Sequence, residues 1–262
     1  LYALRDVTAT VEAIPLIASS IMSKKIAEGT SALVLDVKTG NGAFMSDPKR
    51  AKELASVMVD LGKAAGVKTR ALVTAMDQPL GLTAGNALEV QESIEVLQGG
   101  GPKDVVDLTI LLAREMLELV GVQSKDPESA LRDGSAMDIW KKMVRAQGGD
   151  PDAPLPKSRE AHQISATESG TISSMHALKV GVAAWRLGAG RSRQGEQVQS
   201  GAGVVIHKKP GEEIKAGEPL FTLHTDEAER FERAIEAISS AVEISKDGTV
   251  APHLPLVVDR IS

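Results

Sequence analysis

The chain contains 262 residues, 42% of them hydrophobic, which is enough to build a core at the size where single cores begin to divide into domains. A formal net charge of -5 and only two Trp, one Tyr and three Phe residues exclude the basic, aromatic surface of a nucleic-acid-binding protein. No apolar run is long enough to span a bilayer, and the absence of cysteine excludes disulfides and thiolate metal sites, so we expect a soluble, cytoplasmic protein without nucleic-acid or membrane partners.

The N-terminal segment contains the first predicted helix. Residues 16–27 have a helical pattern that ends before Gly29, a residue type that commonly terminates helices. Pro15 precedes this pattern and predicts a bend between the helix and the residues upstream. The segment begins without a methionine, and we expect the chain to be a fragment of a longer protein.

Three polar side chains in this segment can converge on one ligand. Ser20 and Lys24 are four residues apart, so they share one face of a helix. Arg5 lies upstream of the expected bend. A guanidinium, a hydroxyl and an ammonium group can together hold a small, flat, oxygen-rich molecule. The alternative is that these side chains form a solvated helix face.

Two strand-turn-helix units follow. The apolar runs at residues 31–38 and 69–75 predict buried strands, and residues 48–66 and 85–97 predict helices. Such a succession implies parallel strands joined by right-handed crossovers. Residues 38–42 contain a single Gly-x-Gly, which is weak evidence for a dinucleotide-binding loop. They form either a tight turn or a loop that lines a site.

Two further helices and a linker complete this part of the chain. Residues 104–119 and 128–146 have helical patterns, although Gly134 interrupts the second. Residues 148–157 contain three prolines after two glycines, a composition that neither a helix nor a central strand accepts. We interpret them as the linker to a C-terminal domain.

Beyond the linker, short β-like runs alternate with glycines, and residues 226–238 predict a helix. Residues 208–223 resemble the turn region of biotinyl and lipoyl carrier domains, but they lack the sequence context of the lysine that those domains modify. We therefore expect Lys208, Lys209 and Lys215 to be solvated. A carrier-like fold without the carrier function is the expectation for this region.

The histidines all lie in the C-terminal region, and no two of them have a metal-ligand spacing with a carboxylate. We expect structural roles for them and no zinc site. A Ser-His-Asp triad remains open, although no G-x-S-x-G motif supports it. The histidines are His162, His176, His207, His224 and His253.

Several long motifs occur in a characteristic order. They are YALRDVTATVEAIPLI with SSIMSKK, then LVLDVKTGNGAFM, then QPLGLTAGNALEVQESIEVL, and finally GAGR. In this order they resemble the thymidine and pyrimidine-nucleoside phosphorylases, and the resemblance covers essentially the whole chain. Several long motifs in one order are much more specific than one short motif.

The resemblance implies a pyrimidine-base site. In that family, the arginine of YALRD and the serine and lysine of the following helix hold the base, and the matching residues here are Arg5, Ser20 and Lys24. The family's phosphate-binding groups and a histidine near the base come from a segment upstream of Leu1. The resemblance therefore implies that this chain carries half of the site and is inactive alone.

The resemblance also implies a monovalent cation site, for K⁺. The matching positions are Leu80, Thr83 and Glu92, and two carbonyl oxygens with one carboxylate suit a hard, weakly held ion. The alternative for Glu92 is a polar residue on a helix surface. The GAGR motif gives a turn from which Arg191 can face a cleft.

The activity implied by the resemblance is phosphorolysis of a pyrimidine nucleoside, thymidine first, to free base and (2-deoxy)ribose 1-phosphate in pyrimidine salvage. Phosphate is the co-substrate, no organic cofactor is needed, and the enzyme is expected to be a homodimer. Cleavage of the glycosidic C–N bond leaves negative charge on the base, which preorganised cationic donors stabilise most in the transition state. Two alternatives remain: an anthranilate-type phosphoribosyltransferase, although no acidic magnesium motif is evident, and a non-catalytic relative or carrier-like module.

The expected fold is α/β, with a mostly parallel central sheet, flanking helices and a C-terminal α+β domain of hammerhead-like form. The expected domains are residues 1–28 (the end of a small helical, base-binding domain), 30–147 (central α/β), 148–157 (linker) and 158–262 (C-terminal α+β).

Overall fold

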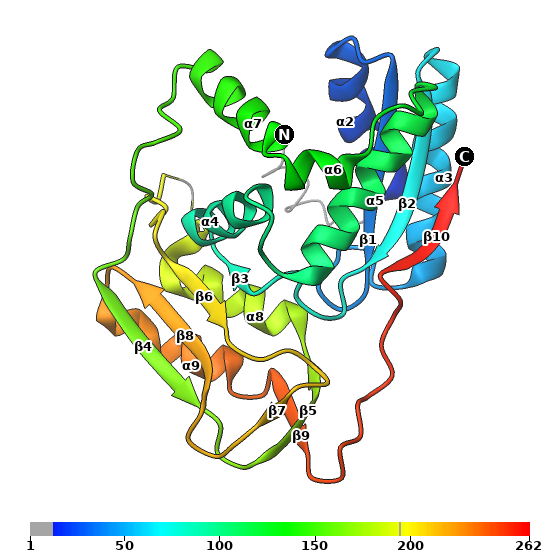
Figure 1. Ribbon diagram of the computed structural model, residues 1–262. Coiled ribbons are helices and arrows are strands. Elements are labelled where there is room, and N and C mark those ends of the chain that lie inside the picture. Colours follow the sequence, from blue (N-terminus) through cyan, green and yellow to red (C-terminus); the bar gives the residue numbers. More distant parts are fainter. Residues whose placement is uncertain (1–12, 194) are drawn as a thin grey trace. The chain divides into compact units, whose positions relative to one another are not determined.

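A computed structural model describes residues 13–193 and 195–262 (Figure 1). The protein is a mixed α/β structure with two compact units, each assembled from segments that are distant in the sequence. Unit 1 comprises the described residues up to Asp77 with Leu108–Pro127 and Leu254–Ser262, and unit 2 comprises Gln78–Asp107 and Glu128–His253. The domain boundaries expected from the sequence remain predictions.

Unit 1 is built on a three-stranded sheet in the order β1-β2-β10. The strands are β1 (Ala32–Thr39), β2 (Lys68–Ala75) and β10 (Val257–Ile261). The first two pair in parallel, as the strand-turn-helix pattern predicted, whereas β10 pairs antiparallel with β2. Among the described residues this sheet has one parallel and one antiparallel strand pair, so a mostly parallel sheet is not confirmed. The sequence analysis did not predict β10.

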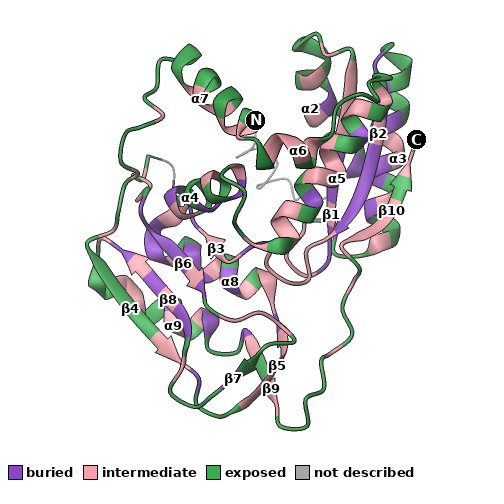
Figure 2. Cartoon of the chain, viewed as in Figure 1, coloured by how far each residue is buried: buried purple, intermediate pink, exposed green. Residues whose placement is uncertain are grey.

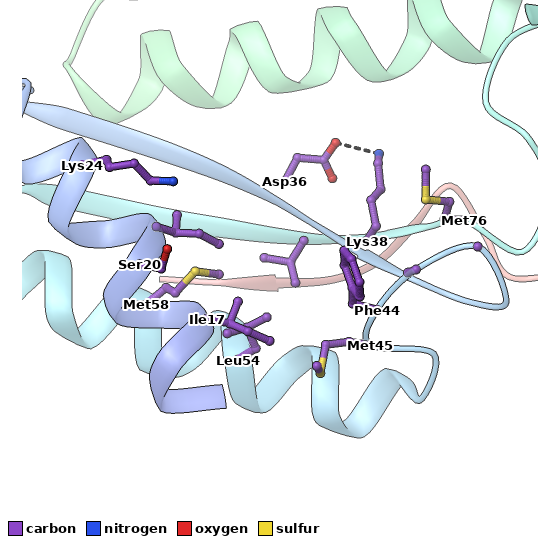
Figure 3. Close-up of a pocket in the computed structure, with 14 residues that line it drawn as sticks. Ile17, Ser20, Lys24, Asp36, Lys38, Phe44, Met45, Leu54, Met58 and Met76 are labelled. Atoms are coloured by element: carbon purple, nitrogen blue, oxygen red, sulfur yellow. Dashed lines mark hydrogen bonds and ion pairs between the residues drawn. The ribbon is translucent and has the colours of Figure 1, made fainter. Parts of the chain in front are cut away.

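Helices cover both faces of this sheet. They are α2 (Ile14–Ala27), α3 (Pro48–Ala64) and the part of α5 (Lys103–Leu119) that begins at Leu108. Figure 3 shows α2 and α3 on one side of the strands and α5 on the other. The core on the α2 and α3 side is apolar because the inward positions of both helices and of β1 are aliphatic. Its central members are Ala18, Met22, Leu35, Val37, Leu54 and Met58.

The beginnings of α2 and α3 follow from their sequences. Asp47 caps α3, with its side chain accepting a hydrogen bond from the Lys49 amide at 3.0 Å, and Pro48 occupies the first turn. Pro15 likewise lies within the first turn of α2. The helix therefore begins before the position that the sequence analysis gave it, because a proline in the first turn loses no helical hydrogen bond.

Buried and half-buried charges join the sheet to α5. Arg70 on β2 is 12% exposed and donates to Glu115 at 2.5 Å and to Glu118 at 3.2 Å. Arg260 on β10 contacts the same two carboxylates, at 2.9 and 3.0 Å. Two guanidinium groups therefore share two carboxylates, and this arrangement links β2, β10 and α5.

We expect Arg70→Met to lower the free energy of unfolding by about 1.5–3 kcal/mol, the usual worth of hydrogen bonds to a charged group. Glu115 is 9% exposed and, among the described residues, keeps Arg260 as its one cationic partner in this variant. Urea unfolding measures the change. Arg260→Met should cost less, because Arg260 is 44% exposed and exposed ion pairs are weak. Equal stability of wild type and Arg70→Met would contradict the role given to this network.

Unit 2 contains two antiparallel sheets and several helices. The sheets have the orders β3-β6-β8-β4 and β7-β5-β9. The strands are β3 (Thr83–Ala84), β4 (Glu160–Ser165), β5 (Gly170–Met175), β6 (Gly203–Ile206), β7 (Glu213–Ile214), β8 (Pro219–Thr225) and β9 (Val242–Ser245), and the helical elements are α4 (Asn86–Leu97), α6 (Pro127–Arg132), α7 (Ser135–Ala146), α8 (Ala177–Ala184), a π-helical turn (Trp185–Ala189), a 3₁₀ turn (Ala228–Arg230) and α9 (Phe231–Ile238).

The core of unit 2 lies between its sheets and the helices α8 and α9. Phe221, Leu223, Ile206 and Leu187 are almost completely buried there. Figure 2 shows buried residues concentrated on β6 and β8, whereas α7 has an exposed and intermediate surface. The α/β and α+β character expected from the sequence is therefore present, and a hammerhead-like form stays a prediction.

Two predicted elements of unit 2 are corrected by the structure. The helix expected at residues 128–146 is divided into α6 and α7, because Gly134 adopts a left-handed conformation with φ of 80°. The β-like run expected at residues 162–172 is two strands, β4 and β5, which belong to different sheets. In the first case the left-handed Gly134 overrides the helical pattern. In the second case residues 166–169 separate the two strands.

Candidate functional site

A cavity of about 640 Å³ lies in unit 1 beside α2 and β1 (Figure 3). Its volume lies in the range of small-molecule sites. Its lining comes from α2, β1, the loop between β1 and α3, α3 and the residue that follows β2. The lining residues are Ile17, Ser20, Ile21, Lys24, Asp36, Val37, Lys38, Gly42, Ala43, Phe44, Met45, Leu54, Met58 and Met76.

Helix α2 contributes both of the described base-site candidates. Ser20 and Lys24 line the same cavity, as their four-residue spacing indicated. In Figure 3 the Lys24 side chain extends from the end of α2 toward β1. The neighbouring Lys25 forms an ion pair with Glu28 at 3.1 Å and does not line the cavity. Arg5 lies outside the described residues.

Strand β1 contributes a polar group to the cavity wall. Asp36 and Lys38 alternate with buried apolar residues and therefore share one face of the strand. The Lys38 ammonium donates to Asp36 at 2.6 Å and to Thr74 at 2.9 Å, and the Thr74 hydroxyl donates to Asp36 at 2.5 Å. Thr74 is fully buried, so the two charged side chains are fixed against the sheet.

The loop after β1 forms the mouth of the cavity. Gly40 has φ of 113°, and a Cβ atom there would lie 2.5 Å from the Asp77 amide nitrogen, so only glycine fits. The Asn41 side chain donates from Nδ2 to the Asp77 carbonyl at 2.7 Å, and the Gly42 backbone amide donates to the Met76 carbonyl at 2.8 Å. These bonds hold the loop in a position from which Phe44, 79% exposed, lines the cavity.

The cavity suits a flat molecule with one polar edge. Its apolar lining includes Ile17, Ile21 and Phe44, which can contact the faces of a ring. Ser20 and Lys24 supply a hydroxyl and an ammonium group at the polar side. A heteroaromatic ring with carbonyl oxygens has this combination of apolar faces and hydrogen-bonding edge.

The cation-site candidates lie together in unit 2. Leu80 and Thr83 belong to residues 79–83 after Asp77, a segment that we call the loop although Thr83 begins β3, and Glu92 lies on α4. The Glu92 carboxylate accepts a hydrogen bond from the Leu82 amide at 2.7 Å. This contact brings α4 against the loop, one residue before Thr83 and two residues after Leu80.

Glu92 is not a helix-surface residue, because it is only 8% exposed. Burial raises the pKa of Glu92 above its ordinary value of 4.5, although the hydrogen bond from the Leu82 amide and the nearby Thr83 hydroxyl oppose this. The Thr83 hydroxyl oxygen lies close enough to affect the carboxylate, yet it is buried and no partner satisfies its hydrogen-bond geometry. A buried carboxylate beside an oxygen with a spare lone pair is a donor set that fits a small cation.

The expectation that Lys209 is solvated is wrong. Its ammonium donates to the carbonyl oxygens of Pro79 and Gly81 and to the Asp104 carboxylate. The sequence analysis missed this contact because more than 100 residues separate Lys209 from each partner. Lys208 and Lys215, by contrast, line a polar surface depression of the same unit.

The remaining candidates make local contacts within unit 2. Arg191 donates from Nε to the Glu196 carbonyl at 3.2 Å, so it stabilises its own turn. His207 contacts the Thr222 hydroxyl at 2.8 Å, and His224 contacts Ser158 at 3.3 Å. No group of three or more metal-ligating side chains occurs among the residues that the structure describes.

Sequence reasoning missed part of the cavity wall. Asp36, Lys38 and Phe44 lie within the motif LVLDVKTGNGAFM, but sequence reasoning named none of them as a site residue and left residues 38–42 open between a tight turn and a loop that lines a site. The signal was available: two charged residues at alternate positions of an otherwise apolar strand need partners or a site. Thr74 gives no such signal, because a threonine is ordinary in a strand.

The chain is similar to two family models and to several known enzymes. Residues 1–137 match the glycosyl transferase family, a/b domain, and residues 171–245 match the pyrimidine nucleoside phosphorylase C-terminal domain. The chain is 58% identical to thymidine phosphorylase of Mycobacterium tuberculosis (strain ATCC 25618 / H37Rv) over 262 residues, which are 100% of the chain and 61% of that protein. It is 45% identical to pyrimidine-nucleoside phosphorylase of Geobacillus stearothermophilus over 273 residues, 100% of the chain and 62% of that protein.

A similar relation holds to pyrimidine-nucleoside phosphorylase of Bacillus subtilis (strain 168), with 43% identity over 265 residues, 97% of the chain and 61% of that protein. The chain thus spans about three fifths of the length of these curated relatives.

Within the described residues, no helix has the length and apolar character that crossing a membrane requires.

Proposed function

Because the chain belongs to the family of thymidine and pyrimidine-nucleoside phosphorylases, we propose that this protein cleaves a pyrimidine nucleoside, thymidine first, with phosphate. The products are the free base and (2-deoxy)ribose 1-phosphate. The observation that carries the proposal is the cavity beside α2, which Ser20 and Lys24 line together with apolar side chains that include Ile17, Ile21 and Phe44. A pyrimidine has the matching shape, with two flat faces and an edge of carbonyl and ring-nitrogen groups.

We assign base binding to Arg5, Ser20 and Lys24. The departing pyrimidine carries negative charge over its ring nitrogen and carbonyl oxygens, and fixed cationic donors stabilise this charge more than they stabilise the neutral nucleoside. Lys24 and Arg5 suit the oxygens, and the Ser20 hydroxyl suits the ring edge. Phosphate attacks the sugar carbon directly, so no covalent enzyme intermediate is required.

The apolar wall fixes the plane of the base. Phe44 presents an exposed ring at the mouth of the cavity, and an aromatic face adds attraction to a heteroaromatic ring beyond its buried area. Positioning of the base in this plane aligns the glycosidic bond for attack, which contributes to the rate through orientation. We propose that phosphate-binding groups other than the residues named here complete the site. We also propose that the enzyme acts as a cytoplasmic homodimer.

We propose a monovalent cation site, for K⁺, formed by Leu80, Thr83 and Glu92. The buried Glu92 carboxylate and the buried Thr83 hydroxyl without a hydrogen-bond partner support it. Carbonyl, hydroxyl and carboxylate oxygens are the ligands that such ions prefer. The cation would compensate the Glu92 charge and fix the loop after Asp77. It takes no part in bond cleavage in this proposal.

The cation proposal predicts a pH dependence of stability. Because the pKa of Glu92 is raised, the folded protein binds a proton more tightly than the unfolded chain. Stability should therefore fall as pH rises from the ordinary Glu pKa of 4.5 through the raised value. Urea unfolding in a tetramethylammonium buffer should show this fall, and added KCl should reduce it. In Glu92→Gln both effects should shrink; an equal KCl effect in the two proteins contradicts the site.

The activity test separates the remaining candidate functions. Incubation of the intact protein with thymidine and phosphate should release thymine. The change in ultraviolet absorbance measures this release, which should stop when phosphate is left out. The alternative, an anthranilate-type phosphoribosyltransferase, requires anthranilate and phosphoribosyl pyrophosphate as substrates. Ribosylation of anthranilate without cleavage of thymidine or uridine would contradict the proposal. Absence of both reactions would favour a non-catalytic relative.

A further inference from the structure

The Lys209 ammonium group occupies a position that resembles the site of a bound cation. It is held by the carbonyl oxygens of Pro79 and Gly81, the latter at 2.9 Å, and by the Asp104 carboxylate at 3.0 Å. The Lys209 side chain is 21% exposed, so the ammonium is largely shielded from water. Two backbone carbonyls and one carboxylate are the kind of oxygen donors that also bind hard metal ions.

Asp104 closes this arrangement around Gly81. Besides the ammonium, its carboxylate accepts the Gly81 amide hydrogen at 3.1 Å. Gly81 therefore uses both its amide and its carbonyl group in the same network. Its φ of 71° is a left-handed conformation, and a Cβ atom at this position would lie 2.1 Å from Oε1 of Glu92, so glycine allows the loop to approach the Glu92 carboxylate closely.

A carboxylate group on α4, from another side chain, holds the same loop. Glu92 accepts the Leu82 amide hydrogen at 2.7 Å, only one residue beyond Gly81. The five loop residues from Pro79 to Thr83 are thus fixed by one protein cation and one buried carboxylate. Two of the three residues proposed to bind K⁺ belong to this loop, and Glu92 is the third.

We propose that Lys209 is a positioning residue for the K⁺ site: its ammonium, paired with Asp104, serves as a built-in cation that fixes the loop carrying the K⁺ ligands. This inference rests on the cation site of the proposed function. Removal of the ammonium leaves the carbonyls of Pro79 and Gly81 without their donor and the Asp104 carboxylate without its cation. The loop then loses the geometry that K⁺ binding requires.

The test compares the K⁺ affinity of the intact wild-type protein with that of Lys209→Met. Thallium NMR measures the affinity with Tl⁺ as the K⁺ probe. A second titration adds KCl in place of tetramethylammonium chloride, so that the ionic strength stays constant. We expect about a tenfold loss of affinity for both ions, the order of effect when a hydrogen-bonded charge is removed. Lys208→Met is the matched control, because Lys208 adjoins Lys209 but lines a different surface depression. It should bind both ions as the wild type does.

A rescue experiment distinguishes positioning from general loss of fold. Methylammonium chloride should restore Tl⁺ affinity in Lys209→Met, because the free ion can occupy the vacated position, and it should have no effect on the wild type. Unchanged Tl⁺ affinity in Lys209→Met overturns the inference, and so does a wild type that binds no Tl⁺. If Lys209→Met is unfolded, Lys209→Arg and Asp104→Asn provide the same test, and wild-type affinity in both overturns it.

The thymine-release assay keeps this inference separate from the proposed function. A wild type that releases thymine, combined with Tl⁺ binding independent of Lys209, rejects the inference alone. A wild type whose Tl⁺ binding depends on Lys209 but which does not cleave thymidine or uridine rejects the proposed activity alone.

Discussion

Lys24→Met in the intact protein is expected to lower kcat/KM for thymidine roughly 10- to 150-fold, which corresponds to one lost charge-assisted hydrogen bond of about 1.5–3 kcal/mol. Under the proposed function, the physical reason is the charge on the departing base, which the ammonium would stabilise more in the transition state than in the ground state. Lys24 lines the cavity at the end of α2. Initial rates of thymine release at several thymidine concentrations measure the change.

Lys25→Met is the matched control for this experiment. Lys25 is the next residue on the same helix, but it pairs with Glu28 and does not line the cavity. Its removal should leave kcat/KM nearly unchanged. Both side chains lie at the surface, so both variants should unfold at nearly the wild-type temperature. Full activity of Lys24→Met, or equal losses in the two variants, would show that the base does not bind beside Lys24.

Gly40→Ala is expected to give the largest loss of stability, about 2–5 kcal/mol, from two additive causes. A residue with a Cβ atom costs about 1–2 kcal/mol at a left-handed φ, and here φ is 113°. The new methyl group would also lie 2.5 Å from the Asp77 nitrogen and 2.8 Å from the Met76 carbonyl carbon. Such overlap in packed backbone costs about 1–3 kcal/mol. Urea unfolding measures the sum.

The control for this prediction is Gly29→Ala. Gly29 also has a positive φ, 74°, but no atom lies within 4 Å of the position of an added Cβ. It should therefore lose only the conformational part, about 1–2 kcal/mol. Because the Gly40 loop positions Phe44 at the cavity, Gly40→Ala should also weaken thymine binding, whereas Gly29→Ala should not. Equal stability losses in the two variants would contradict the close approach between Gly40 and Asp77.

The sequence predicted those features of the fold that local patterns determine. The apolar runs gave β1 and β2 and their parallel pairing. The four-residue spacing placed Ser20 and Lys24 on one face, and both line the cavity. The motifs also indicated the family that the comparisons support. The strands and the helix face each follow from residues close together in the chain, so period and spacing were sufficient for them.

Features that depend on distant residues could not be predicted in this way. Strand β10 pairs with β2, but the short apolar sequence of β10 does not indicate which strand, more than 180 residues away, it pairs with. Lys209 looked like a surface lysine in a glycine-rich turn, and only the tertiary fold brings it to Pro79 and Gly81. The burial of Glu92 could not be predicted for the same reason: its position in a helix did not indicate that the loop after Asp77 would cover it.

The most direct test of the central proposal is a crystal structure of the intact protein with thymine bound. The account predicts that the ring lies in the cavity beside α2, with its polar edge within hydrogen-bond distance of Ser20 Oγ and Lys24 Nζ and one face toward Phe44. Thymine bound elsewhere, or bound in this cavity without contact to Ser20 or Lys24, would contradict the account.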